Sequence, residues 1–121
     1  MEARVIGLEK LGKHDVELVG GKNSSLGEMI SHLSNAGVSV PGGFATTAAA
    51  YREFLDQSGL NTRIQAELSQ LDVEDVIALA ETGAKIRKWV VETPLTESLE
   101  KEIRTAFAEL SKDNPDIAVA V

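Results

Sequence analysis

Apolar residues recur at helical spacing through most of this sequence, and a glycine or a proline ends most of these runs. The most regular run follows Thr96 and Glu97, either of which is expected to open a helix. Its apolar face comprises Leu99, Ile103, Ala106, Phe107 and Leu110. An earlier run begins near Asn23–Ser25 and ends at Gly37, with an apolar face of Leu26, Met29, Ile30 and Leu33. A chain with this pattern must fold as several short helices, each burying one face.

Capping residues predict where these helices begin and end. Ser25 and Glu28 have the S-x-x-E spacing of a capping box, which places a helix start there. Gly59 and Thr93-Pro94 are expected to stop two later helices. The remaining helices are predicted from Ala48 to Ser58 after a cap at Thr46 or Thr47, from a cap at Asn61, and from Asp72, Glu74 and Asp75 to about Val91.

Three segments are expected to be extended, near residues 4–9, 39–46 and 117–121. Val40 precedes a proline and therefore avoids helical backbone, and 117–121 is an apolar run typical of a buried strand. The predicted fold is α+β (mixed α/β), with a small sheet covered by four or five helices. Pairing of the first strand with the last would bring the glycine pair at 20–21 and residues 41–44 to one edge.

Composition excludes several kinds of protein. The 121 residues suffice for one domain, and the absence of cysteine removes disulfides, thiol catalysis and thiolate metal sites. The net charge of −7 argues against a nucleic-acid or anionic-membrane partner. No apolar stretch approaches the roughly 20 residues of a membrane span. A cytoplasmic location is expected.

Gly20-Gly21-Lys22-Asn23 is the segment with the most specific chemistry. Glycines allow backbone N–H groups to approach an anion, and the following helix start adds unpaired donors. Lys22 supplies a positive charge. The spacing is not that of a Walker A loop, because Val16 and Asn23 stand where that loop needs glycine and Ser or Thr. Two interpretations follow from the residues alone: a phosphate site, or a plain turn with a solvated lysine.

Two longer runs carry a family resemblance. Val19-Gly-Gly-Lys-Asn-Ser-Ser-Leu-Gly-Glu-Met29, followed by Gly37-Val-Ser-Val-Pro-Gly-Gly-Phe-Ala-Thr-Thr47, resembles the start of the phosphoenolpyruvate synthases, or pyruvate, water dikinases. Ala84–Trp89 and Thr93-Pro94 extend the resemblance over essentially the whole chain. Relatives of that family are pyruvate, phosphate dikinase and the rifampicin phosphotransferases.

The resemblance implies that residues 1–121 are the amino-terminal part of an ATP-grasp nucleotide-binding domain. In such enzymes ATP phosphorylates a histidine on a swivelling domain, and a carboxy-terminal barrel passes the phosphoryl group to pyruvate. ATP, pyruvate and water thereby become AMP, phosphoenolpyruvate and phosphate. The family continues from a strand like 117–121 into an arginine-serine-serine segment. Both other domains lie beyond residue 121, so the isolated fragment is expected to be inactive.

The site residues implied by the resemblance are phosphate-binding ones. Lys22 is expected to contact the ATP phosphates, together with Gly20, Gly21 and, through its backbone, Asn23. No catalytic residue or metal ligand is expected in this chain, and Mg²⁺ would be held by residues outside it. The parent is expected to be a homodimer.

Two alternatives stay open at the level of sequence. The chain could be a stand-alone, non-catalytic binding module on the same scaffold, or part of a related dikinase or antibiotic phosphotransferase. Ser24 and Ser25 are expected to act as helix caps. Neither His14 nor His32 has a partner at metal-ligand or triad spacing, so no catalytic role is expected for them.

Overall fold

The computed structural model describes residues 3–121, which form two compact units. The first unit joins the chain up to Tyr51 with Glu97–Val121, and the second is Arg52–Thr96. In chain order the elements are β1 (Val5–Gly7), the 3-10 helix η1 (Leu8–Lys10), α1 (Val16–Val19), α2 (Gly21–Asn35), β2 (Phe44–Thr46), α3 (Ala48–Gln57), α4 (Leu60–Ser69), α5 (Val76–Glu92) and α6 (Glu97–Ser111). The boundary between the units falls within α3.

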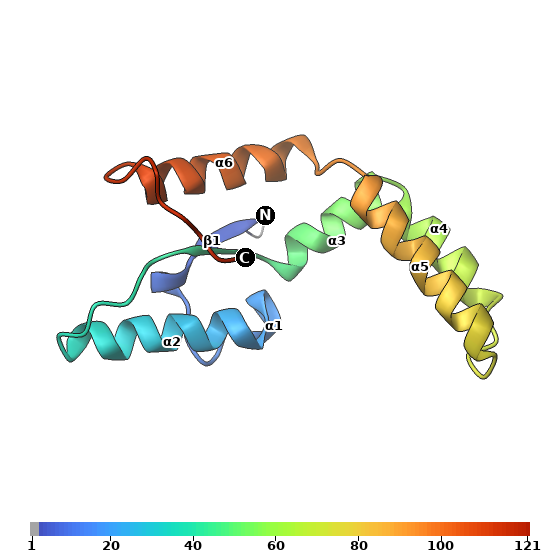
Figure 1. The fold of residues 1–121 in the computed structure, drawn as a ribbon, viewed down its shortest axis with the longest axis horizontal. Helices are drawn as coiled ribbons and strands as arrows, with labels where there is room; N and C mark the ends of the chain where they lie inside the picture. Colours follow the sequence, from blue (N-terminus) through green and yellow to red (C-terminus); the bar gives the residue numbers. More distant parts are fainter. Residues whose placement is uncertain (1–2) are drawn as a thin grey trace. The chain divides into compact units, whose positions relative to one another are not determined.

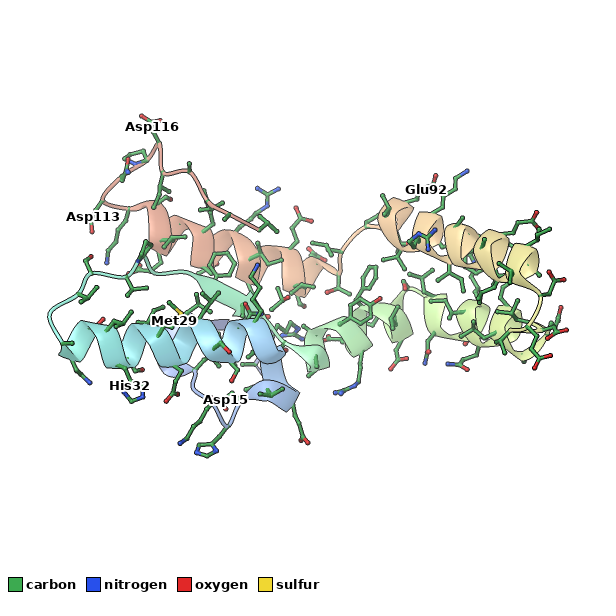
Figure 2. All side chains as sticks on the ribbon, turned by 60° about the horizontal axis from the view of Figure 1, so that its bottom comes forward. Asp15, Met29, His32, Glu92, Asp113 and Asp116 are labelled. Carbon is green, nitrogen blue, oxygen red and sulfur yellow. The ribbon has the colours of Figure 1, made fainter. Side chains whose placement is uncertain are left out.

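The first unit is a small antiparallel sheet with a helix on each face. β1 pairs with β2 so that Ile6 lies opposite Ala45. Figures 1 and 2 show the strands between α2 and α6. The Arg4 guanidinium and the Glu102 carboxylate form an ion pair of 2.8 Å, which ties α6 to the start of β1. The predicted α+β fold class is therefore confirmed.

The core of this unit lies on the α2 side of the sheet. Its buried members are Leu8, Leu11, Val19 and Ala45, and Ile6, Leu18, Leu26 and Ile30 pack against them. These residues come from β1, η1, α1, α2 and β2 and, for Leu11, from the loop after η1. Burial of such aliphatic side chains contributes about 1.5–3 kcal/mol each. The core therefore fixes α2, whose first residues carry the predicted phosphate site.

The second unit contains a helical hairpin of α4 and α5. Trp89 on α5 is flanked by two cations, with the Arg63 guanidinium 4.1 Å and the Lys85 ammonium 5.3 Å from the ring centroid. Lys85 also pairs with Glu67 of α4 at 2.6 Å. No residue of α5 is buried. An ion pair and a cation–π contact at the surface therefore link these two helices.

Several predicted boundaries are confirmed. The Thr47 hydroxyl accepts a hydrogen bond from the Ala50 N–H at 3.1 Å, and the Asp75 carboxylate accepts one from the Ala78 N–H at 3.1 Å. Gly37 and Gly59 follow α2 and α3 with φ of 81° and 77°, the left-handed region expected of glycine after a helix. Local capping chemistry was sufficient to place these ends.

The predicted strand at 117–121 is absent, and so is its pairing with the first strand. Residues 117–121 have no regular structure and are exposed, apart from the half-buried Ile117. β1 pairs with β2 instead, in a sheet of two strands. An apolar, β-branched run shows strand propensity, but a strand also needs a partner edge, and that requirement is not local.

Two further local predictions are wrong. The first strand ends at Gly7, after which the chain turns into η1. Residues 16–19, where no element was predicted, form the short helix α1. Asn61 does not cap α4: Gly59 precedes that helix, and the Asn61 amide donates to the Asp56 carboxylate at 3.0 Å.

Candidate functional site

Gly20 forms the junction between α1 and α2. Its backbone has φ 86° and ψ 164°, a conformation open essentially to glycine alone. Its N–H closes α1 on the Val16 carbonyl at 2.8 Å, and its carbonyl accepts the Ser24 N–H at 3.1 Å. One residue thus ends one helix and begins the next, so the sharp turn needs a glycine at this position.

The first turn of α2 presents unpaired donors. Among the described residues, no backbone carbonyl accepts the N–H groups of Gly21, Lys22 or Asn23, and no side chain caps the helix. The first turn carries no acidic residue. Lys22 is exposed and has no ion-pair partner within residues 3–121. Three amides and one ammonium are therefore free to meet an anion.

Gly21 differs from Gly20 in what the fold requires of it. A Cβ built at Gly21 would meet no atom within 4 Å, and its φ is not positive. The protein's own packing therefore does not demand glycine there. The missing side chain leaves the backbone open to close approach from outside, as a phosphate-binding amide requires.

The predicted capping box is not formed. Helix α2 begins at Gly21, so Ser25 and Glu28 lie inside it. Ser24 does not cap either: its hydroxyl is buried and donates to the Gly12 carbonyl at 2.6 Å. The S-x-x-E pattern was misleading because the loop at 11–13, which is distant in sequence, forms hydrogen bonds with Ser24 and Glu28 instead.

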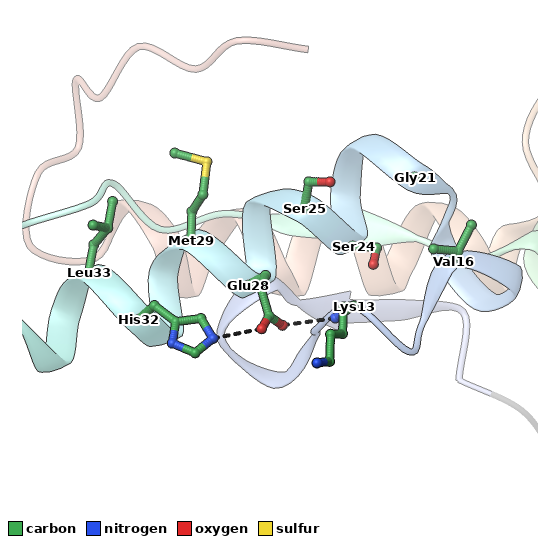
Figure 3. Close-up of a pocket in the computed structure, with 9 residues that line it drawn as sticks. All are labelled: Lys13, Val16, Gly21, Ser24, Ser25, Glu28, Met29, His32 and Leu33. Atoms are coloured by element: carbon green, nitrogen blue, oxygen red, sulfur yellow. Dashed lines mark hydrogen bonds and ion pairs between the residues drawn. The ribbon is translucent and has the colours of Figure 1, made fainter.

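Glu28 is bonded on both of its carboxylate oxygens. One accepts the Lys13 N–H at 2.9 Å, and the other lies 2.6 Å from Nε2 of His32 (Figure 3). The Lys13 amide, followed by the hydrogen bond with His32, lowers the pKa of Glu28 from its ordinary value of 4.5. Figure 2 shows His32 and Met29 projecting from α2 in different directions. The structural partner of His32 is therefore Glu28, on the same helix.

Two hollows lie on the surface of the first unit, and different glycines line them. A hollow of about 470 Å³ along α2 is lined by Gly21, Lys13, Ser25 and His32, among others (Figure 3). Gly42 and Gly43 line another, of about 880 Å³, with Phe44 and residues of α6. The predicted meeting of the glycine pair with residues 41–44 at one sheet edge is therefore wrong.

The donor set at the start of α2 suits phosphate oxygens and not a metal ion. It consists of N–H groups and an ammonium, whereas Mg²⁺ requires oxygen ligands. No group of three metal-ligating side chains occurs within residues 3–121. His14 lies exposed in the turn before α1.

Sequence reasoning missed the residues that hold α2 in place. Gly27 lies in the middle of α2, where a Cβ would come within 2.5 Å of the Leu11 carbonyl oxygen. A glycine inside a helical pattern is itself a signal of close packing. Ser24 gave no such signal, because buried and exposed serines look alike in a sequence.

Comparisons with known proteins show which family this sequence belongs to. The sequence profile of the pyruvate phosphate dikinase AMP/ATP-binding domain matches residues 16–121. A protein of Pseudomonas aeruginosa named phosphoenolpyruvate synthase is 67% identical over 117 residues, which cover 97% of this chain and 15% of that protein. Proteins of the same name from Escherichia coli and Aquifex aeolicus are 54% and 36% identical, covering 97% and 99% of the chain.

The chain spans about 15% of the length of the first two of these relatives and 14% of the third. None of the helices in the described part of the chain has the length and apolar character needed to cross a membrane. The profile match covers the glycine pair, all of α2 and everything that follows. The chain therefore belongs to the pyruvate phosphate dikinase AMP/ATP-binding domain family.

Proposed function

We propose that the first turn of α2 binds the phosphates of ATP. The observation that carries the proposal is the set of three unaccepted N–H groups at Gly21, Lys22 and Asn23, beside an exposed lysine and no carboxylate in that turn. Lys22 neutralises phosphate charge, and the amides orient the phosphate oxygens. The family's description as an AMP/ATP-binding domain supports this assignment.

The chain then serves as the amino-terminal nucleotide-binding portion of a phosphoenolpyruvate synthase. That enzyme converts ATP, pyruvate and water to AMP, phosphoenolpyruvate and phosphate through a phosphohistidine. The relatives' shared name and their identity along nearly the whole chain support this proposal. Mg²⁺ would be held by residues outside the chain, which also contribute the pyruvate site. The cytoplasmic location and the homodimer remain predictions.

A titration of Mg·ATP followed by backbone amide shifts tests the site. We compare the native chain with Lys22→Ala and with Lys88→Ala, a control that removes the same charge from exposed α5. Shifts should concentrate at residues 20–25. Lys22→Ala should weaken binding about tenfold or more, because a charge-assisted hydrogen bond is lost. Lys88→Ala should leave the affinity unchanged.

Other outcomes would contradict parts of the proposal. Equal affinity in all three proteins would exclude Lys22 as a phosphate ligand, and shifts confined to other residues would exclude the α2 site. If the isolated chain shows no shifts, the same substitutions are made in a full-length relative with these residues. There Lys22→Ala should raise KM for ATP, and an unchanged KM and kcat would refute the assignment.

A further inference from the structure

We propose that Ser24 and Glu28 are positioning residues, which hold the turn at Gly20–Asn23 in place before any anion binds. This inference rests on the proposed function, because it concerns the same phosphate site. Neither side chain points its hydrogen-bonding atoms at the free amides. Both act through the loop at 11–13, which lies against α2.

Three consecutive loop residues are each engaged by one residue of α2. Gly27 packs closely against Leu11, because a Cβ atom added at Gly27 would lie only 2.5 Å from the Leu11 carbonyl oxygen. The Ser24 hydroxyl donates to the Gly12 carbonyl at 2.6 Å, and the Glu28 carboxylate accepts the Lys13 N–H at 2.9 Å. The positions three and four apart along α2 share one face, so the loop follows that face.

The same loop is also tied to the start of α1. The Gly12 N–H donates to the Asp15 carboxylate at 2.9 Å, and the Asp15 N–H donates back to the Gly12 carbonyl at 3.0 Å. The Asp15 carbonyl then accepts the Val19 N–H at 3.1 Å. The chain from Gly12 through α1 and Gly20 to Ser24 is therefore a ring closed by hydrogen bonds.

Closure of this ring restricts the backbone conformations open to Gly20. A glycine in a turn would ordinarily add backbone freedom, and ordering it on binding costs free energy. Here the residues on both sides are anchored to Gly12, and the side-chain amide of Asn23 donates a hydrogen bond to the Val19 carbonyl at 3.0 Å. The amides of the first turn are thus held in a preorganised arrangement, which favours binding by reducing the ordering cost.

Ser24→Ala is the most direct test because it leaves the ring's other bonds intact. The Gly12 carbonyl keeps the Asp15 N–H as a partner, so the variant leaves no unsatisfied buried acceptor and should fold. The matched control is Ser31→Ala, at an exposed position of the same helix. Heteronuclear NOE values of the Gly21–Asn23 amides are measured without ligand, followed by titration with Mg·ATP and with inorganic tripolyphosphate.

Ser24→Ala should lower these NOE values and weaken the binding of both ligands by about 3- to 10-fold, the range that loss of one hydrogen bond allows. Ser31→Ala should change neither quantity. Glu28→Ala should act like Ser24→Ala, and Glu28→Gln should restore both quantities, since its amide oxygen still accepts the Lys13 N–H. If Glu28→Gln restores the NOE values and the affinity, Glu28 acts by holding the loop through a hydrogen bond and not by its negative charge.

The results separate this inference from the proposed function. If Lys22→Ala weakens binding but Ser24→Ala changes neither NOE nor affinity, the positioning role is wrong and the phosphate site stands. The same conclusion follows if Ser31→Ala has the effect of Ser24→Ala. A third outcome is that Ser24→Ala mobilises the amides, but neither the unmodified chain nor a full-length relative binds either ligand at α2. In that case both the phosphate site and the positioning role are wrong.

Discussion

The two units of this chain are built in different ways. The first has a continuous aliphatic core beneath a two-stranded sheet, and α2 is fixed there by packing, by the partly buried hydrogen bond of Ser24 and by the exposed one of Glu28. In the second, α5 has no buried residue, and Val76 and Ile77 are 75% and 73% exposed. The predicted chemistry lies in the first unit. A phosphate site needs fixed donors, and a packed core fixes them.

The largest expected effect is the loss of the first unit's core. Leu11→Ala removes a side chain that is 4% exposed and should lower the stability of that unit by about 2–5 kcal/mol. Leu79→Ala, at an exposed position of α5, should change stability by no more than about 0.5 kcal/mol. Urea unfolding is followed by amide signals for the first unit and by Trp89 fluorescence for the second. Comparable losses in both variants would remove the contrast between the units.

Gly27→Ala tests the close approach of α2 to the loop at 11–13. The added methyl group would meet the Leu11 backbone, so the helix must shift, at a cost of about 1–3 kcal/mol. At a helical site with room for the methyl group the same change would stabilise, since alanine is the better helix former. Gly83→Ala in α5 provides that comparison, because only the flexible end of Arg87 lies near it. A stabilising Gly27→Ala would contradict the packing described here.

Arg63→Gln tests the hairpin of the second unit. Loss of the guanidinium over Trp89 should cost about 0.5–1 kcal/mol, the usual worth of an exposed cation–π contact, and should shift the tryptophan emission. Arg87→Gln, on exposed α5, removes the same charge from a side chain with no ring contact in the described structure. Indistinguishable urea midpoints and emission spectra for the two variants would show that the contact contributes nothing.

The smallest expected effect is a pH dependence from Glu28. Because folding lowers the pKa of this carboxyl below 4.5, the unfolded chain takes up its proton first as the pH falls. The stabilisation is complete above about pH 4.5 and is lost as the pH drops through the folded-state value. Glu28→Gln should flatten this part of the stability curve for the first unit. An unchanged slope below pH 4.5 would mean that the carboxylate does not favour the folded state.

Much of the fold could be predicted because its signals are local. Thr47 caps α3 as expected, Asp75 stands at the start of α5 where an acidic residue was expected, and Gly37 and Gly59 have the left-handed backbone typical of helix ends. The phosphate-site prediction at Lys22 came from the family resemblance, whereas the neighbouring residues alone also allowed a plain turn. The capping box at Ser25 and Glu28 was predicted wrongly because the signal there is not local. The Glu28 carboxylate accepts a hydrogen bond from Lys13, fifteen residues earlier in the chain.

By itself, the sequence determined where most of the helices lie, the caps at Thr47, Gly37 and Gly59, and that two glycines and a lysine stand at the start of a helix, because each of these depends on residues within one or two turns. The tertiary structure alone decided that β1 pairs with β2, that 117–121 stays unpaired, and that Ser24 and Glu28 hold a loop. The physical reason is competition for partners. A polar side chain or a strand edge takes whichever partner the folded chain brings to it, and spacing along the sequence does not reveal that partner.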